Sequence, residues 1–140
     1  MPNKPPSEGI KTLITAHAAT VSYAIHIGSI PDSPDNVVLI QDSPGLAANP
    51  KFLLDFPGIR MVIRGSVGSY LATYVIAKAF KDILLGLQSQ DIDGDRWVSI
   101  TTSGDLSANG QDKDDRPLLT MDFKLIIEPQ TDILSNRVAL

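Results

Sequence analysis

The sequence predicts an α+β fold, in which a four-stranded antiparallel or mixed sheet carries two helices packed on one face. Two segments repeat apolar residues at helical spacing, four segments alternate or cluster apolar residues as strands do, and Pro, Gly and Asp separate them. The expected order is helix, strand, strand, helix, strand, strand (α-β-β-α-β-β). A chain of 140 residues has the size of one domain. We therefore expect a single domain over residues 1–140, with flexible ends at about 1–8 and 130–140.

The first helix is predicted from Ser7 to about Gly28. Ser7 is a suitable N-cap, and the negative charge of Glu8 fits the positive end of a helix. Apolar side chains then recur at helical spacing on one face: Ile10, Leu13, Ile14, Val21, Ala24 and Ile25. Glycine at position 28 favours a helix end, and Pro31 and Pro34 prevent the helix from continuing.

The first two strands are predicted on either side of a long loop. The turn-forming stretch "DSPDN" precedes residues 37–41, a short apolar run that we expect to be the first strand. Residues 42–58 are expected to be mostly loop. The second strand, "IRMVIRG", alternates in such a way that Arg60 and Arg64 lie on the face opposite its first apolar set.

The second helix is predicted to follow Gly65 and Gly68. Its core-facing stripe steps by four residues: Leu71, Val75, Ala79, Ile83 and Leu87, widened by Ala72, Ile76, Phe80 and Leu84. Lys78 and Lys81 are expected on the polar side. A helix with this pattern packs on a sheet or on another helix.

The last two strands are predicted after a turn with Asp-Gly at its centre, "DIDGDR". The third strand is "WVSITTSG" and the fourth is "RPLLTMDFKLIIEP". In the fourth, Thr120, Asp122 and Lys124 alternate with residues expected to face the core, namely Leu119, Met121, Phe123, Leu125 and Ile127. The polar residues 104–115 between the two strands form a loop longer than a hairpin requires, and such loops are often functional.

Composition narrows the range of functions. The chain has no cysteine, which excludes thiolate catalysis and cysteine-based zinc sites and favours a reducing compartment. The formal net charge is −4 and the basic residues are dispersed, which argues against a nucleic-acid-binding surface. The N-terminus lacks the apolar core of a signal peptide, and no apolar run approaches the roughly 18 residues of a membrane span. We expect a soluble protein without a membrane partner.

Candidate catalytic and metal-binding residues are few. His17 lies in the apolar stripe of the first helix and is interpreted as a hydrogen-bonded core or interface residue, and His26 as an exposed one. "DIDGDR" has the wrong glycine position for a calcium loop, and "QDKDD" is interpreted as a solvated acidic loop rather than a magnesium site. "RGSVGSY" lacks the lysine of a phosphate-binding loop. We therefore expect no catalytic residue, no metal and no cofactor.

A linear pattern covers about residues 10–129. It consists of "PDSPDNVVLIQDSPG", "FPGIRMVIRG", "YLATYVIAKAFKDILLG" and "DGDRWVSITTSGDLSANGQDKDDRPLLTMDFKLIIEP". In order and spacing, these segments resemble the minor capsid and tail terminator proteins of long-tailed bacteriophages. Each segment alone is a turn or an amphipathic element, so the specificity of the resemblance lies in their succession.

The resemblance implies a structural virion protein that is not an enzyme. It implies a homo-oligomeric ring, usually of six subunits, that docks on the last ring of the major tail tube protein, stops polymerisation and presents a surface to the head–tail connector proteins. DNA would pass through the ring without specific binding. The protein would be assembled in the bacterial host cytoplasm and reside in the virion tail. The alternatives are a head-completion or neck connector protein and a small enzyme with residues 104–115 as a lid.

The interface of such a ring is predicted in the polar loops, at residues 42–56 and 104–116. Arg60 and Arg64 are available for carboxylates of a neighbouring subunit, such as Asp112 or Asp114, or are solvated residues of the sheet. The full set of predicted interface residues is Arg60, Arg64, Asp105, Asp112, Asp114, Asp115 and Arg116.

Overall fold

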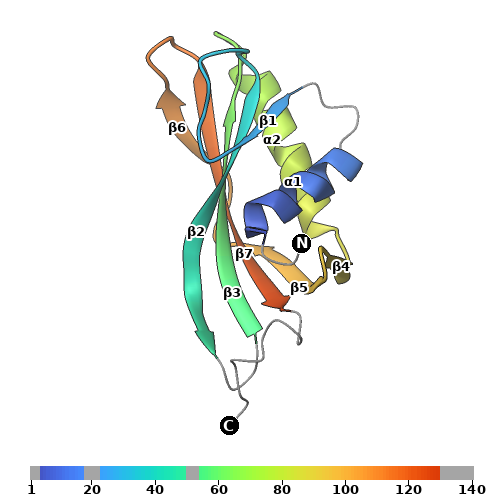
Figure 1. The fold of residues 1–140 in the computed structure, drawn as a ribbon. Coiled ribbons are helices and arrows are strands. Elements are labelled where there is room, and N and C mark those ends of the chain that lie inside the picture. Colours follow the sequence, from blue (N-terminus) through green and yellow to red (C-terminus); the bar gives the residue numbers. More distant parts are fainter. Residues whose placement is uncertain (1–3, 18–22, 50–53, 130–140) are drawn as a thin grey trace.

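The computed structural model describes residues 4–17, 23–49 and 54–129. These residues form two helices and seven strands (Figure 1). In chain order they are α1 (Pro6–His17), β1 (Ala24–Ile27), β2 (Val37–Asn49), β3 (Leu54–Arg64), α2 (Tyr70–Leu85), β4 (Gln90–Ile92), β5 (Asp95–Thr102), β6 (Ser107–Gln111) and β7 (Pro117–Glu128).

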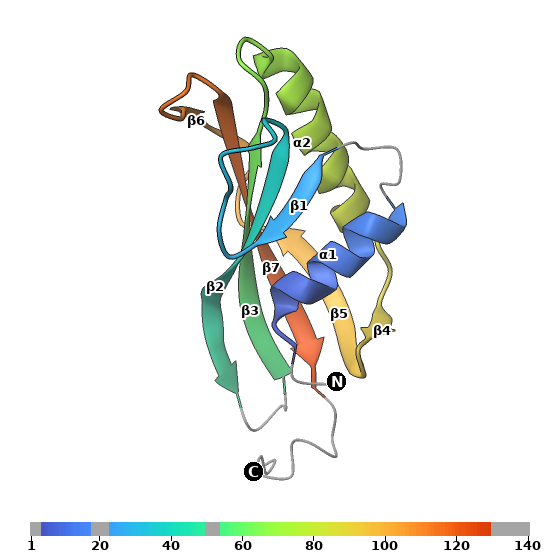
Figure 2. The same ribbon diagram turned by 45° about the horizontal axis from the view of Figure 1, so that its top comes forward.

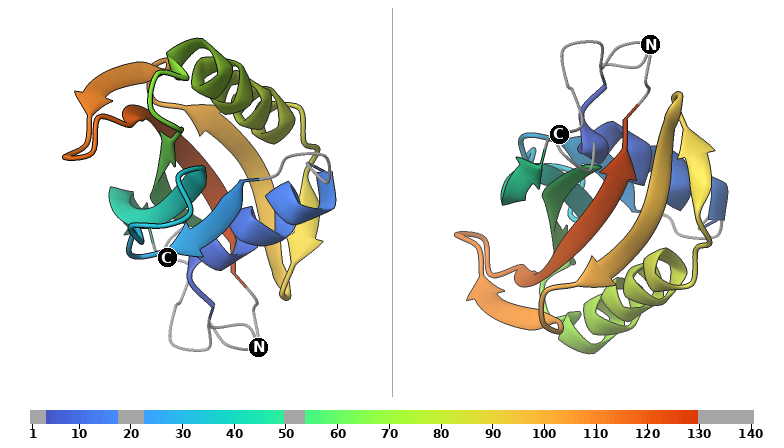
Figure 3. Two further views of the ribbon diagram at one scale, coloured as in Figure 1. Left: turned by 90° about the horizontal axis from the view of Figure 1, so that it is seen from above. Right: turned by 90° about the horizontal axis from the view of Figure 1, so that it is seen from below.

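The strands of the described residues form one mixed sheet in the order β1-β2-β3-β7-β5-β4, and β6 pairs with β7 off this path. β1 runs parallel to β2, and all other pairs are antiparallel. Along one edge of β7, the first half pairs with β6 (Ser107 opposite Thr120) and the second half with β5 (Thr102 opposite Phe123). The sheet is twisted from strand to strand, and this twist curls it into a half-barrel (Figure 3).

The predicted fold class is therefore wrong. The protein is mostly β, with a curled seven-stranded mixed sheet in the described residues instead of a four-stranded sheet with two helices packed on one face. The prediction missed β1, β4 and β6, which are short, and β4 and β6 also have few apolar residues. Each of them gains its hydrogen bonds from a longer neighbouring strand, and a short sequence window does not contain that partner.

The first predicted helix is too long. α1 ends at His17, and Ala24 to Ile27 form strand β1, whose partners are Val37 to Ile40. Residues 18–22 lie outside the described residues. Apolar residues at 24, 25 and 27 fit a helical stripe and a strand equally well, and pairing with β2 decides between them (Figure 2). The loop predicted at 42–58 is also wrong, because β2 and β3 extend through most of it.

The N-terminus of α1 is held by a carboxylate from the sheet rather than by the side chain of Ser7. The backbone N–H of Ser7 donates to Asp42 Oδ1 at 3.0 Å, and its hydroxyl donates to Asp42 Oδ2 at 2.7 Å. A carboxylate at this place satisfies a free N–H of the first turn and suits the helix dipole. Ser7 is fully buried.

Residues 1–3 and 130–140 are outside the described residues, and the single-domain organisation stays a prediction.

The core lies between the sheet and the two helices. The five β7 residues predicted to face the core are buried, and so are Ile59, Met61 and Ile63 of β3. The turn predicted at Asp-Gly is confirmed, because Asp93 and Gly94 have φ angles of 51° and 90° and join β4 to β5 as a two-residue hairpin loop.

The predicted orientation of α2 is wrong in part. Its buried residues are Thr73, Ala77, Phe80 and Leu84. Phe80 and Leu84 belong to the predicted packing side, but Leu71 and Val75 of the central stripe are exposed. Small residues where α2 meets the end of β3 decide which face of the helix is buried. A Cβ atom added at Gly65 would lie only 1.8 Å from Thr73 Oγ1, which leaves no room for a larger residue at position 65. Glycine at 65 therefore lets Thr73 approach the end of β3 closely.

Candidate assembly interface

A buried arginine cluster fixes two loops at one end of the sheet. Arg116, 4% exposed, donates from Nε to Asp112 Oδ2 at 2.8 Å and from its terminal nitrogens to the carbonyl of Asp32 and the carboxylates of Asp35 and Asp114. Guanidinium groups suit such sites because they present several donors in one rigid plane. The cluster thereby ties the "DSPDN" stretch to the loop between β6 and β7.

Arg64 extends this cluster from the end of β3. It is 2% exposed and donates to the carbonyls of Pro34 at 2.7 Å and Asp35 at 3.0 Å. Burial, followed by the nearby charge of Arg116, lowers the pKa of Arg64, and the side chain still remains protonated at neutral pH. Both arginines therefore have partners within this chain and hold the segment that leads into β2.

Asp112 is the acceptor that organises the loop between β6 and β7. Burial opposes its ionisation, but the backbone N–H groups of Arg116 and Asp114 and the Arg116 guanidinium outweigh this effect, so its pKa lies below the ordinary value. Asp115 has a φ of 62°, and its N–H donates to the carbonyl of Asp112. Asp114 and Asp115 are exposed at the tip of this loop.

The predicted residue Asp105 lies in the β5–β6 loop, outside the arginine cluster, and pairs with α2. Lys81 Nζ donates to Asp105 Oδ1 at 2.8 Å, and the N–H of Leu106 donates to the same oxygen at 2.7 Å. The hydrogen bond from Lys81 comes first among the causes that lower the pKa of Asp105. Asp105 is exposed, so the pair joins α2 to the β5–β6 loop at the surface.

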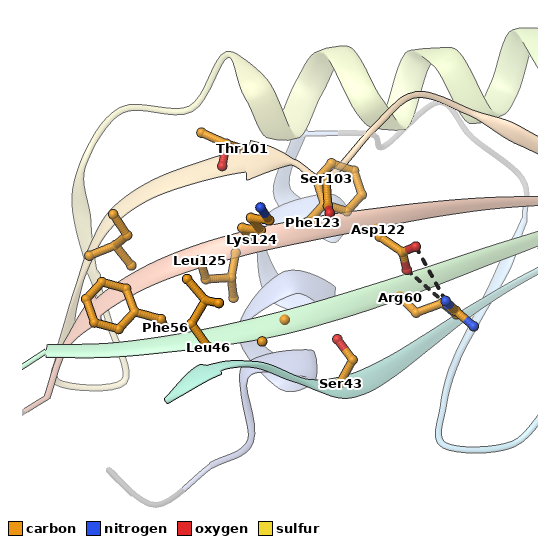
Figure 4. A pocket seen from close by; sticks show the side chains of 13 residues that line it. Ser43, Leu46, Phe56, Arg60, Thr101, Ser103, Asp122, Phe123, Lys124 and Leu125 are labelled. Atoms are coloured by element: carbon orange, nitrogen blue, oxygen red, sulfur yellow. Dashed lines mark hydrogen bonds and ion pairs between the residues drawn. The ribbon is translucent and has the colours of Figure 1, made fainter. Parts of the chain in front are cut away.

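Arg60 lies on the outer face of the sheet beside a groove. Its Nε donates to Asp122 Oδ1 at 2.9 Å across β3 and β7, where the two residues are directly opposite. The groove has a volume of about 460 Å³, with Leu46 and Phe56 toward one end and the Arg60–Asp122 pair toward the other (Figure 4). We call it the sheet groove; Thr101, Ser103 and Lys124 also line it.

Sequence reasoning missed a second surface feature, an exposed apolar patch at the start of α2. We call it the α2 patch; its members are Val67, Tyr70, Leu71, Tyr74 and Val75. Leu71 is 79% exposed and Val75 63% exposed. The sequence carries a signal for it, because α2 has more apolar residues than one face can bury, but Leu71 and Val75 were predicted in the packing stripe.

Other kinds of site are not seen in the described part of the chain. Its His, Asp and Glu side chains form no group of three placed to hold a metal ion. None of its helices is long and apolar enough to span a membrane. His26 lies in β1 and is half-buried, and the side chain of His17 lies outside the described residues.

Comparison with known proteins identifies the family. Residues 12–129 match the family model described as "Bacteriophage tail terminator protein". The chain belongs to the bacteriophage tail terminator family. The resemblance noted in the sequence is thus confirmed, and this tail terminator is a structural protein of the virion tail.

A solved structure supports the fold of this tail terminator. A chain from "Virion of native gene transfer agent (GTA) particle" is similar, with a TM-score of 0.64 and 17% sequence identity, over 87% of this chain and 93% of that chain. At this identity the likeness shows a shared fold. The search of curated proteins gives no match.

Proposed function

We propose that this tail terminator works as a closed ring of identical subunits, six in number, that binds the last ring of the tail tube. The observation that supports the proposal is the family match over residues 12–129. Docking of the ring stops addition of the major tail tube protein, and the opposite face of the ring receives the head–tail connector proteins. The protein acts through shape and contact and has no catalytic role.

A ring needs heterologous contacts, in which one surface of a subunit meets a different surface of the next. Closure of the ring removes the free ends that would otherwise allow growth. The arginine cluster suits such a subunit because it holds residues 32–36 and the β6–β7 loop in fixed positions on the sheet. Loops that are fixed before docking lose less conformational entropy on binding.

Exposed residues of the predicted interface set are proposed to make the polar contacts of the ring. Asp114 and Asp115 project from the β6–β7 loop, and Asp105 and Arg60 are exposed with partners in their own subunit. Arg64, Asp112 and Arg116 contribute by positioning the loops. Rim contacts of this kind affect specificity and association rate more than affinity.

DNA is proposed to pass through the ring without specific binding. The chain has a formal net charge of −4, and an acidic surface repels phosphate. A passage lined by clustered Lys and Arg would instead bind DNA and slow its exit. Retention of the ring on a DNA column at physiological salt contradicts this part of the proposal.

The test is electron microscopy of tail tubes grown from purified tube protein with and without the terminator. We expect shorter tubes of limited length, each with one additional ring at one end. The ring's rotational averages also give the number of subunits. Tubes of unchanged length without bound density contradict the proposal and favour a connector on the head side, which binding to purified connector protein then establishes.

A further inference from the structure

We propose that the α2 patch of one subunit docks into the sheet groove of the next subunit in the ring. This inference rests on the proposed ring and names the two surfaces that build it. The occupant of the groove is therefore a second copy of this chain, and the contact is heterologous.

The α2 patch has the composition of a binding surface. Most of the large apolar side chains that are exposed in the described residues gather there, within one turn before α2 and its first two turns. Tyr70, Leu71, Tyr74 and Val75 follow the helical repeat, so they form one stripe on the helix surface. Contiguous apolar patches of this kind, with tyrosine, mark protein–protein contacts.

The sheet groove offers matching chemistry. Leu46 is 63% exposed and lies with Phe56 at the apolar end, the charged Arg60 and Asp122 lie toward the other end, and Lys124 lies between them (Figure 4). Tyrosine combines an apolar ring with a hydroxyl that requires a polar partner. Leu71 and Val75 therefore suit the apolar end, and the hydroxyls of Tyr70 and Tyr74 suit the polar rim.

The two surfaces lie on opposite sides of the subunit. On α2, the patch faces away from Thr73, Ala77 and Phe80, which pack against the sheet. On β7, Asp122 and Lys124 alternate with core residues and so project from the face that does not contact the helices. One subunit cannot cover its own groove with its own patch. A patch and a complementary pocket at separate places on one chain connect subunits head to tail, as a ring requires.

The test uses cysteine pairs, because the chain has no cysteine of its own. Leu46→Cys and Leu71→Cys are combined in one chain, the variant is assembled on tail tubes, and a short bis-maleimide is added before a denaturing gel. We expect a ladder of covalent oligomers that ends at the number of subunits in the ring. Each single variant yields monomer, since like positions do not meet.

A matched control places the second cysteine outside the groove. Val98, 40% exposed on β5, does not line it, so the pair Val98→Cys and Leu71→Cys is expected to give no ladder. A ladder from the control pair but not from Leu46 with Leu71 overturns the inference, and so do dimers from Leu71→Cys alone. Tubes that are capped by the double variant without any ladder also overturn it and leave the proposed function standing. Failure of the unmodified protein to cap tubes contradicts the proposed function instead.

Charge substitutions test the same contact without a cross-linker. Leu71→Glu alone and Leu46→Lys alone are each expected to weaken capping by about tenfold or more, because each buries an unpaired charge in an apolar contact. The double variant places the two charges together and should recover capping. If the double variant is as defective as the singles while all three remain folded, the two residues do not meet and the inference is wrong.

Discussion

Both faces of α2 carry large apolar side chains, but only one of them is buried. The face toward the sheet is made of Thr73, Ala77, Phe80 and Leu84, all buried. The other face carries Leu71 and Val75, which are among the most exposed apolar residues described. The small Thr73 and Ala77 let the helix approach the sheet, and Phe80 and Leu84 fill the core below it. Apolar character alone therefore does not decide which face of α2 is buried.

The largest expected loss of stability comes from a substitution on the inner face of α2. Phe80→Ala removes a side chain that is 1% exposed and leaves a cavity, so the free energy of unfolding should fall by about 3–5 kcal/mol. Urea unfolding followed by the fluorescence of Trp97, the one tryptophan of the chain, measures it. Val75→Ala on the outer face is the control and should cost at most about 0.5 kcal/mol. Equal losses for the two variants contradict the assigned faces.

Substitution of an alanine by a larger side chain on each face of α2 tests the same difference between the two faces. Ala77→Leu adds volume to a fully buried position and should lower the free energy of unfolding by about 1–3 kcal/mol. Ala72→Leu, on the exposed side, makes the same chemical change with no neighbour to displace, and its stability should remain within about 0.5 kcal/mol of the parent protein. The same urea experiment applies. Destabilisation by Ala72→Leu alone indicates that the helix is rotated from the position described.

The outer face is expected to matter for assembly and not for folding. Leu71→Glu should change the free energy of unfolding by no more than about 0.5 kcal/mol, since the residue is exposed and a carboxylate suits the first turn of a helix that has no acidic residue there. Tube length in the growth assay should increase. A variant that unfolds at much lower urea shows that Leu71 belongs to the core.

The smallest expected effect is at the surface pair that joins α2 to the β5–β6 loop. Because the pKa of Asp105 is lowered in the folded protein, its contribution to stability is present above the unfolded pKa and is lost as pH falls through the folded pKa. Asp105→Asn should therefore narrow the difference in urea midpoint between neutral and acidic pH, and only slightly, since exposed pairs contribute little. An unchanged pH dependence indicates that the pair adds nothing to stability.

Parts of the fold could be predicted because the information is local. The alternation of β7, the Asp-Gly turn at residues 93 and 94 and the existence of α2 follow from residues close together in the sequence. The succession of such elements also carried the resemblance to tail terminators. The candidate interface was predicted in the polar loops, but the burial of Arg64 and Arg116 depends on "DSPDN", which is distant in the sequence.

The sequence by itself determined strand β7, the existence of the second helix and the family, because each rests on a repeat or on an order of segments that the chain displays directly. Tertiary structure decided that residues 24–27 are a strand, since only β2 supplies their hydrogen-bond partners. It also decided which face of α2 is buried, because both faces are apolar and the choice depends on how closely Thr73 and Ala77 fit against the sheet. The free energies that decide both outcomes come from contacts between segments distant in the sequence, and a local sequence pattern does not contain those contacts.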